Sequence, residues 1–523
     1  MATKICIADT VYVGRWYSLV AYPYPVSDAP FNYTVKFSSN SKNITLIHNT
    51  FYVKSAGEIT ISCVDMNGDT DTVTITAKEP PVVERQEYIV TPTTLDDFLD
   101  KIAECGTYAK INVPKGEYYF EVDDTYKDIP EGVLIDFNDS VINITTSLTG
   151  EEESISYRGF RFLSDHCGIV NANFVGNGLM ENTALSDMCQ IITCDTGDFH
   201  EFKNITFKGM KGFNFKIGGW FHYGYFKPTG VNVGRWKEDN STNGYIADDG
   251  SVITTDGQPH WCMTNQINIV VTPDRSYGVG QSNPWIPSTV RLYDIAFYDE
   301  NGNFIELRKN QQYFRRYYYP PNAVYMRLGV HQSECPPNHV GRDDYCIMRM
   351  AGGNANSERY TYVSELMADN IYYHDNDSGA VSVTGGCGEI HFNRIWCHED
   401  GTTNPWSFDV EDGWNSMCDI TVSHSWLRSI YNHGVQGISY ISTVMYTLTS
   451  NSNVHFSSLI NSIMRWCNYV YDLRCNMTSV NSYMPSISHS GYEDYGNVYE
   501  FGNLTKEQKD KVITGAMAVL DVI

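Results

Sequence analysis

Two carboxylates separated by one residue are the strongest candidates for chemistry in this chain. They are Asp409 and Glu411, which alternate with Phe408 and Val410. If the two apolar side chains face a core, strand geometry turns both carboxylates to the opposite face, with backbones about 6.5–7 Å apart. Carboxyl groups at such a separation can flank a glycosidic bond, and crowding raises the proton affinity of one of them. The spacing predicts an acid/base pair for glycan cleavage, with Asp412 as a third acidic group.

Aromatic and polar residues surround this pair in the sequence. Trp406 and Trp414 flank it and offer apolar platforms for a sugar ring. Aligning neighbouring repeats places polar side chains in two rows. The first row holds Ser382, Asp409 and Tyr431, and the second holds Thr384, Glu411 and His433. We therefore expect His433 beside Glu411, where it would bind substrate and steady a charged intermediate.

A polar turn precedes the first of these repeats and adds candidates for substrate binding. It contains His374, Asp375 and Asp377, and one of its carboxylates could act as a third acidic group from the adjacent repeat. The alternative is that these acids only form turns or face water, as Asp and Asn commonly do.

Several familiar site motifs are missing from the sequence. There is no Gly-rich phosphate loop, no Gly-x-Ser-x-Gly elbow and no His-Glu-x-x-His pair. We expect neither a cofactor nor a metal. A calcium-assisted lyase, which needs three acidic groups and an arginine base, stays open as an alternative with Arg394 and Arg428 nearby in sequence.

The elements that would hold these residues repeat along the chain. Apolar segments follow one another at intervals of 27, 22 and 24 residues, from Val381 to Phe408, to Ile430 and to Val454. Such intervals are typical of the coils of a solenoid, in which each coil buries its apolar face on its neighbours. The repeats predict a parallel β-helix on which the candidate site lies.

The first part of this solenoid carries a recognisable opening. An amphipathic stretch, with Leu95, Phe98 and Ile102 on one face, follows a threonine that can cap a helix. It is followed by Val113-Pro114-Lys115-Gly116, a turn between two strands. This opening resembles that of the pectate-lyase-like right-handed parallel β-helix superfamily, which includes phage tailspikes. The resemblance implies that the helix plugs the open end of the solenoid.

Changes of pattern divide the chain into six segments. We expect an all-β chain with an N-terminal Ig-like β-sandwich, a right-handed parallel β-helix in two parts, and an inserted module that resembles the jelly rolls of phage tail proteins. The segments are an Ig-like sandwich at 1–79, a linker at 80–90, the first β-helix part at 91–233, the inserted carbohydrate-binding-like jelly roll at 234–350, the second β-helix part at 351–480, and a C-terminal region with a terminal helix at 481–523.

Charge and cysteine content exclude some classes of partner. The formal net charge is −25, from 37 basic and 62 acidic residues, which disfavours binding to nucleic acid or to anionic lipid. No apolar run is long enough to span a membrane, and we expect no signal peptide. The 14 cysteines show no zinc-ligand spacing, and only Cys335 and Cys346, which flank one polar loop, are candidates to pair.

The resemblance implies a phage tailspike-like protein of the virion that binds and hydrolyses a bacterial surface polysaccharide. It also implies contact with other phage tail proteins through the N-terminal region. We expect a homotrimer, to which an apolar stripe on a helix within 504–523 would contribute. The alternatives are a receptor-binding or structural tail protein without enzymatic activity, and a polysaccharide lyase.

Overall fold

The computed structural model divides the chain into two compact units. Unit 1 comprises Met1–Pro80, Phe221–Tyr360 and Trp414–Cys418, and unit 2 comprises Pro81–Trp220, Thr361–Gly413 and Asp419–Ile523. The structure describes residues 2–24, 35–149, 155–186, 188–218, 241–254, 261–264, 267–268, 276–281, 292–312, 317–318, 320, 322–331, 345–348, 363–374, 376, 379–384, 387–397, 407–410, 417–432, 435–450, 455–460, 462–470, 477–480, 483–484, 492–494 and 499–500.

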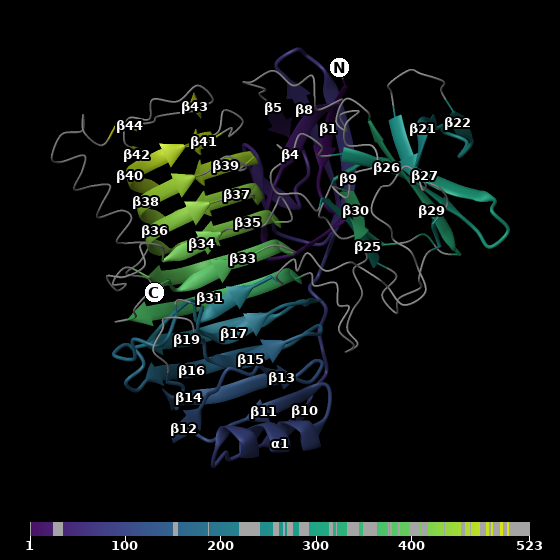
Figure 1. The fold of residues 1–523 in the computed structure, drawn as a ribbon. Helices are drawn as coiled ribbons and strands as arrows, with labels where there is room; N and C mark the ends of the chain where they lie inside the picture. The colour runs from purple at the N-terminus through teal and green to yellow at the C-terminus, as the bar shows by residue number, and fades with distance from the viewer. Residues whose placement is uncertain are drawn as a thin grey trace. The chain divides into compact units, whose positions relative to one another are not determined.

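One large sheet dominates unit 2. Its 25 described strands run from β10 (Gln86–Ile89) to β20 (Phe215–Ile217) and from β31 (Val363–His374) to β44 (Tyr499–Glu500). The pairing is parallel and skips along the chain. Thus β14 (Leu134–Thr145) pairs with β16 (Gly168–Gly176), β16 with β19 (Glu201–Lys208), and β31 (Val363–His374) with β33 (Cys387–Cys397). Figure 1 shows these strands stacked in order above α1. The prediction of an all-β chain with a large parallel sheet is confirmed, and the pairing is that expected of a parallel β-helix.

Alternation along the strands produces the core of unit 2. In the register of the sheet, one row of inward-facing residues crosses five successive coils, and each of its members is 0 or 1% exposed. The row consists of Ile135, Ile169, Phe202, Ala368 and Phe392. Each coil buries its inward face on its neighbours. Side chains available for function therefore lie in the outward-facing rows beside this one.

The predicted helix is present at the end of this stack. It is α1 (Leu95–Cys105), and the Thr94 hydroxyl at its N-cap accepts a hydrogen bond of 3.2 Å from the Asp97 N–H. Lys101 donates to Asp97, which lowers the pKa of that carboxyl to about 2. The Phe98 ring is fully buried and stacks on Phe120 at 5.5 Å. The apolar face of α1 thus covers the first coils.

A ladder of side-chain amides joins consecutive coils at one bend. Asn171 donates to Asp136 at 2.9 Å, Asn204 to Asn171 at 2.8 Å, and Asn370 to Asn204 at 2.9 Å. All three asparagines have positive φ, between 54° and 59°. Asparagine tolerates this backbone conformation better than most residues, so the ladder fits both the bend and the stacking.

Replacing Asn204 with alanine should therefore destabilise unit 2. The change removes the two side-chain hydrogen bonds that Asn204 makes in the ladder. It also places alanine at a φ of 54°, a backbone conformation that asparagine tolerates better. We expect a loss of about 1–3 kcal/mol in the free energy of unfolding, measured by urea titration. The neighbouring exposed Lys203→Ala is the matched control. Equal stability of the two variants would contradict this role of the ladder.

One predicted coil length is wrong. Val381 pairs with Phe408 and Phe408 with Ile430, as the repeat intervals predict. Ile430 then pairs with Leu448, however, and not with Val454. The coil is shorter because β36 (Trp426–Asn432), β37 (Val435–Ile441) and β38 (Val444–Ser450) follow one another with only two residues between them.

The solenoid sheet is interrupted once by a long insertion. β20 (Phe215–Ile217) pairs in register with β32 (Val381–Val383), and the described strands between β20 and β31 lie in antiparallel sheets of their own. The largest contains β26 (Leu292–Tyr298), β27 (Phe304–Gln312) and β29 (Tyr325–His331). The assignment of this insertion as a jelly roll, with bounds 234–350, remains a prediction.

The N-terminal part of unit 1 contains a series of strands. They include β5 (Val35–Ser38), β6 (Ile44–Ile47), β8 (Gly57–Asp65) and β9 (Thr70–Lys78). A four-stranded and a three-stranded sheet share one apolar core. The Ig-like assignment remains a prediction. The expected C-terminal helix and Cys335 lie outside the described residues, and no described helix is long and apolar enough to cross a membrane.

Candidate functional site

Buried charged residues gather in one part of unit 2. Burying an ionisable side chain is unfavourable, so such residues are usually exposed unless a specific role holds them inside. In the described part of unit 2, every buried Asp, Glu or Lys falls between residues 198 and 419, and no Arg is buried. These residues are Asp198, Lys216, Glu365, Glu389, Asp409 and Asp419. Such a concentration favours a functional site over a purely structural role.

Three of these acids occupy one column of left-handed residues. In each coil the chain bends at a residue with positive φ. In the earlier coils this residue is aromatic, as in His166 and Phe199, whose rings stack at 5.3 Å with planes 10° apart. In later coils the residue is Glu365, Glu389 or Asp419, with φ of 52°, 53° and 52°. Acidic side chains thus replace the stacked rings at the same bend.

The register places Glu365 and Glu389 side by side on neighbouring coils. Ser364 pairs with Gly388, and Leu366 pairs with Ile390, so the two glutamates between them occupy equivalent positions on the two coils. Neighbouring strands are about 4.8 Å apart. Glu365 is 6% exposed and Glu389 is 4% exposed. Two acidic side chains are thus buried at equivalent positions of neighbouring coils, an environment that disfavours two charged carboxylates.

A histidine connects this pair with the next coil. His391 Nε2 lies 3.4 Å from Glu365 Oε2, and its Nδ1 lies 3.1 Å from the Thr421 hydroxyl oxygen. Both nitrogens are thereby engaged, and His391 is 3% exposed. When Nε2 carries the proton, it donates to Glu365 and fixes the orientation of that carboxylate. Glu365, Glu389 and His391 are named the glutamate–histidine cluster below.

The glutamate–histidine cluster has the composition of a two-carboxylate site. The backbones of the two glutamates are one strand spacing apart, about 4.8 Å. The Glu365 carboxylate is oriented by His391, and Glu389 occupies the equivalent position on the next coil. Among the described residues, no group of three His, Cys, Asp or Glu side chains is arranged to hold a metal ion.

The row predicted around Asp409 is present on the neighbouring strands. Asp409, in β34 (Phe408–Val410), pairs with Ser382 on one side and Tyr431 on the other, as predicted. The expectation that Asp409 is an exposed carboxylate is wrong, because it is only 2% exposed. Ser382 is also buried and Tyr431 is half-buried, so the row as a whole is covered instead of facing open water.

The structure tests few of the other predicted site residues. Seven lie outside the described residues, namely Glu411, Asp412, Trp406, Trp414, His433, Asp375 and Asp377. His374 is described. It is half-buried at the end of β31, where it pairs with Lys208 and its ring contacts Tyr372 at 6.5 Å. It therefore belongs to a different strand row from Asp409.

Sequence reasoning missed the glutamate–histidine cluster although a signal for it exists. An acidic residue precedes an aliphatic residue at the start of three apolar strands: Glu365-Leu366, Glu389-Ile390 and Asp419-Ile420. The pattern recurs after 24 and then 30 residues, which are coil lengths. Taken with the repeat, it indicates three acids at one position of successive coils.

Comparison with known proteins adds no relative: no protein-family model matches the chain, and no curated protein matches its sequence. Support for a function of the chain therefore comes from the chemistry of the site.

Proposed function

We propose that this chain is a phage tailspike-like protein that binds a bacterial surface polysaccharide and hydrolyses it with paired carboxylates. The observation that carries the proposal is the pairing of Glu365 with Glu389 on adjacent coils, with His391 hydrogen-bonded to Glu365. Two buried acids in different surroundings supply a proton donor and an ionised partner from similar groups.

The stack of coils also offers a surface suited to a polymer. Tyr372, Trp396 and Trp426 occupy one outward row on three strands. Tyr372 and Trp396 stack at 5.7 Å with planes 9° apart, and the Trp396 and Trp426 rings are 5.0 Å apart. Tyr372 is 39% exposed. Aromatic side chains with accessible apolar surface favour contact with sugar rings, so this row supports binding of an extended glycan.

The proposed reaction assigns different roles to the two glutamates. Glu389 in its protonated form gives its proton to the glycosidic oxygen, and the bond to the anomeric carbon breaks. Glu365, held as a carboxylate by His391, attacks that carbon and forms a glycosyl ester. Glu389 then takes a proton from water, which displaces Glu365 and releases the second product.

The pair that the sequence predicted, Asp409 with Glu411, is the second candidate. Its support is the row of Ser382, Asp409 and Tyr431. The strands that carry Ser382 and Asp409, β32 and β34, each directly follow in the sequence a strand of the glutamate–histidine cluster, β31 or β33. Replacing Asp409 with asparagine distinguishes the two pairs. Cleavage should be lost only when a carboxylate of the catalytic pair becomes an amide.

Incubation of the protein with capsular and cell-wall polysaccharides tests the proposal. We expect a fall in polymer size and the release of oligosaccharides without new ultraviolet absorbance. Products that absorb in the ultraviolet would indicate a lyase. Binding without any release of oligosaccharides would favour the non-enzymatic receptor-binding protein.

Assembly as a trimer belongs to the same proposal, together with a place in the virion and attachment to other tail proteins through the N-terminal region. Each chain has a mass of 59.3 kDa, and we expect sedimentation equilibrium to give three times that mass at micromolar concentration. A species with the mass of one chain would contradict the trimer. Removing residues 504–523 should weaken assembly if the terminal helix contributes to it.

A further inference from the structure

One arginine in the first coils of unit 2 has no acidic partner among the described residues. Arg158 begins β15 (Arg158–Phe162), and its guanidinium donates a hydrogen bond to the Met188 carbonyl oxygen. No carboxylate of the described residues forms an ion pair with Arg158, although the whole chain carries a formal net charge of −25. The nearby carboxylate of Asp123 is engaged by Lys127 at 2.9 Å. A half-buried cation in such an acidic chain needs an explanation.

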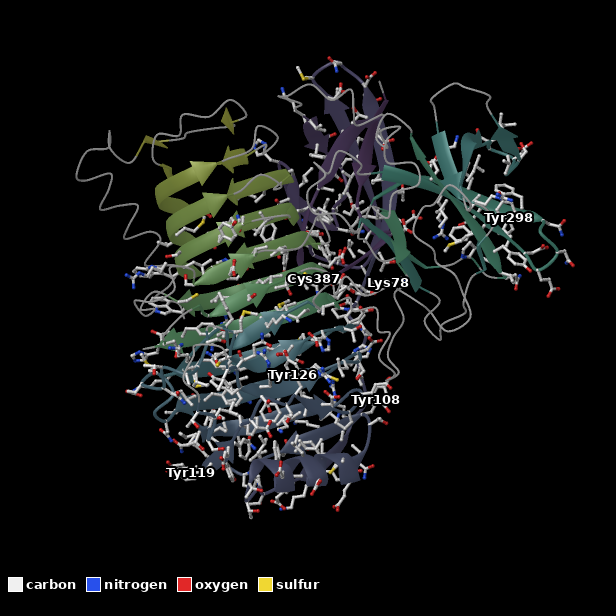
Figure 2. The ribbon with its side chains drawn as sticks, viewed as in Figure 1. Lys78, Tyr108, Tyr119, Tyr126, Tyr298 and Cys387 are labelled. Atoms are coloured by element: carbon white, nitrogen blue, oxygen red, sulfur yellow. The ribbon has the colours of Figure 1, made fainter. Side chains whose placement is uncertain are left out.

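The Arg158 guanidinium lies over the ring of Tyr126. The distance to the ring centroid is 5.3 Å, and the Arg161 guanidinium lies 4.7 Å from the same centroid. The Tyr126 hydroxyl donates to Gln190 Oε1 at 2.9 Å, which fixes the ring. Figure 2 labels Tyr126 on this part of unit 2. Arg158 is therefore held in place by a ring and a carbonyl, and no carboxylate in the described part of unit 2 pairs with it.

Arg161 provides a direct contrast on the same strand. Its Nε and Nη2 atoms donate to the two carboxylate oxygens of Asp128 at 2.7 and 3.0 Å. This two-bond contact compensates the Arg161 charge within the protein. Of the two guanidinium groups that contact Tyr126, only that of Arg158 is left to pair with an anion from outside.

A buried lysine adds a second positive group to the same region. Lys216 is 2% exposed, and its ammonium lies 3.9 Å from Asp195. Burial lowers the pKa of Lys216, Asp195 raises it, and Arg158 and Arg161 lower it further. The arginines therefore lie close enough to act electrostatically on Lys216, and an added anion would favour its charged form.

Lys216 lies in the row that contains Asp409, whereas Arg158 pairs with Gln190 and lies outside this row. Thr193 pairs with Lys216, Lys216 with Ser382, and Ser382 with Asp409. At about 4.8 Å per coil, Lys216 and Asp409 are about 10 Å apart at the backbone.

We infer that Arg158, together with Lys216 and Tyr126, forms a subsite for an oxyanion carried by the polysaccharide. The inference rests on the proposed function and narrows its substrate to a charged glycan. A guanidinium pairs with carboxylate or phosphate through two parallel hydrogen bonds, and both groups occur as substituents of sugars. The Tyr126 ring fixes the Arg158 plane for such a contact.

The test is binding of a uronic-acid-containing, phosphorylated capsular polysaccharide in three forms: native, carboxyl-reduced and dephosphorylated. Affinity electrophoresis would compare wild type, Arg158→Gln and the matched control Arg161→Gln. We expect Arg158→Gln to bind the native polymer about tenfold to a hundredfold more weakly, as for loss of a hydrogen bond to a charged group. Arg161→Gln should change affinity far less, because Asp128 already compensates Arg161.

The chemically altered polymers identify the anion. If it is a carboxylate, wild type binds the carboxyl-reduced polymer as weakly as Arg158→Gln does. If the anion is a phosphate, wild type binds the dephosphorylated polymer as weakly as Arg158→Gln binds the native one. Lys216→Met with an unchanged melting temperature should also weaken binding of the native polymer. This variant provides a second measurement if Arg158→Gln folds poorly.

Two results would overturn the subsite. Either wild type binds and cleaves both altered polymers as well as the native one, or Arg158→Gln and Lys216→Met match wild type on the native polymer. In both cases cleavage itself would persist, and the proposed function would stand. A wild-type protein that neither binds nor cleaves charged or neutral polymers would overturn both the subsite and the function.

Discussion

Replacing Glu365 or Glu389 with glutamine should lower the rate of glycan cleavage by about 10²–10⁴-fold. The amide keeps the size of the side chain and its hydrogen-bonding capacity, but it can neither transfer the proton nor form the glycosyl ester. Because both residues are buried on adjacent coils, we expect the effects of the two changes to be far from additive in the double variant.

The matched control is Glu201→Gln. Glu201 lies in β19 of the same sheet, where it is exposed and pairs in the register with Met367 of β31. Its amide variant should cleave at the wild-type rate. If Glu365→Gln and Glu389→Gln both keep full activity while their melting temperatures fall, the cluster is structural and not catalytic.

Replacing Phe98 with alanine should have the largest effect on stability. The ring is fully buried between α1 and the first coils, and it lies 5.5 Å from Phe120 and 5.7 Å from Phe137. Truncation leaves a cavity at the end of the solenoid, which costs about 3–5 kcal/mol for a large aromatic side chain. Urea titration followed by circular dichroism measures the loss.

Tyr119→Ala is the control for this prediction. Tyr119 also lies in the first coils, in β12 (Glu117–Glu121), but it is 59% exposed and projects from the surface in Figure 2. Its removal should change the free energy of unfolding by well under 1 kcal/mol. A Phe98→Ala variant as stable as Tyr119→Ala would show that α1 does not seal the core.

The fold was predictable where local pattern and repetition agreed. The capped apolar stripe of α1 and the pairing of Val381 with Phe408 and of Phe408 with Ile430 follow from spacing alone. The pairing of Ile430 with Leu448 was not predicted, because a coil of 18 residues departs from the preceding intervals. Coil length depends on turns, and apolar residues such as Val454 recur at several spacings that imitate a repeat.

The site was less predictable because burial depends on contacts far apart in the sequence. Alignment of neighbouring repeats correctly placed Asp409 in a row with Ser382 and Tyr431, but it could not show that this row is covered. Glu365 and Glu389 were missed because each resembles an ordinary acid at the start of a strand. Their significance comes from the register that sets them side by side.

The account is tested most directly by the products that one native capsular polysaccharide yields with wild type and with the Glu365→Gln/Glu389→Gln double variant. Size-exclusion chromatography with ultraviolet detection measures both chain length and unsaturation. The account predicts oligosaccharides without ultraviolet absorbance from wild type, and an intact polymer that remains bound to the double variant. Equal release of oligosaccharides by the double variant, or ultraviolet-absorbing products from wild type, would contradict it.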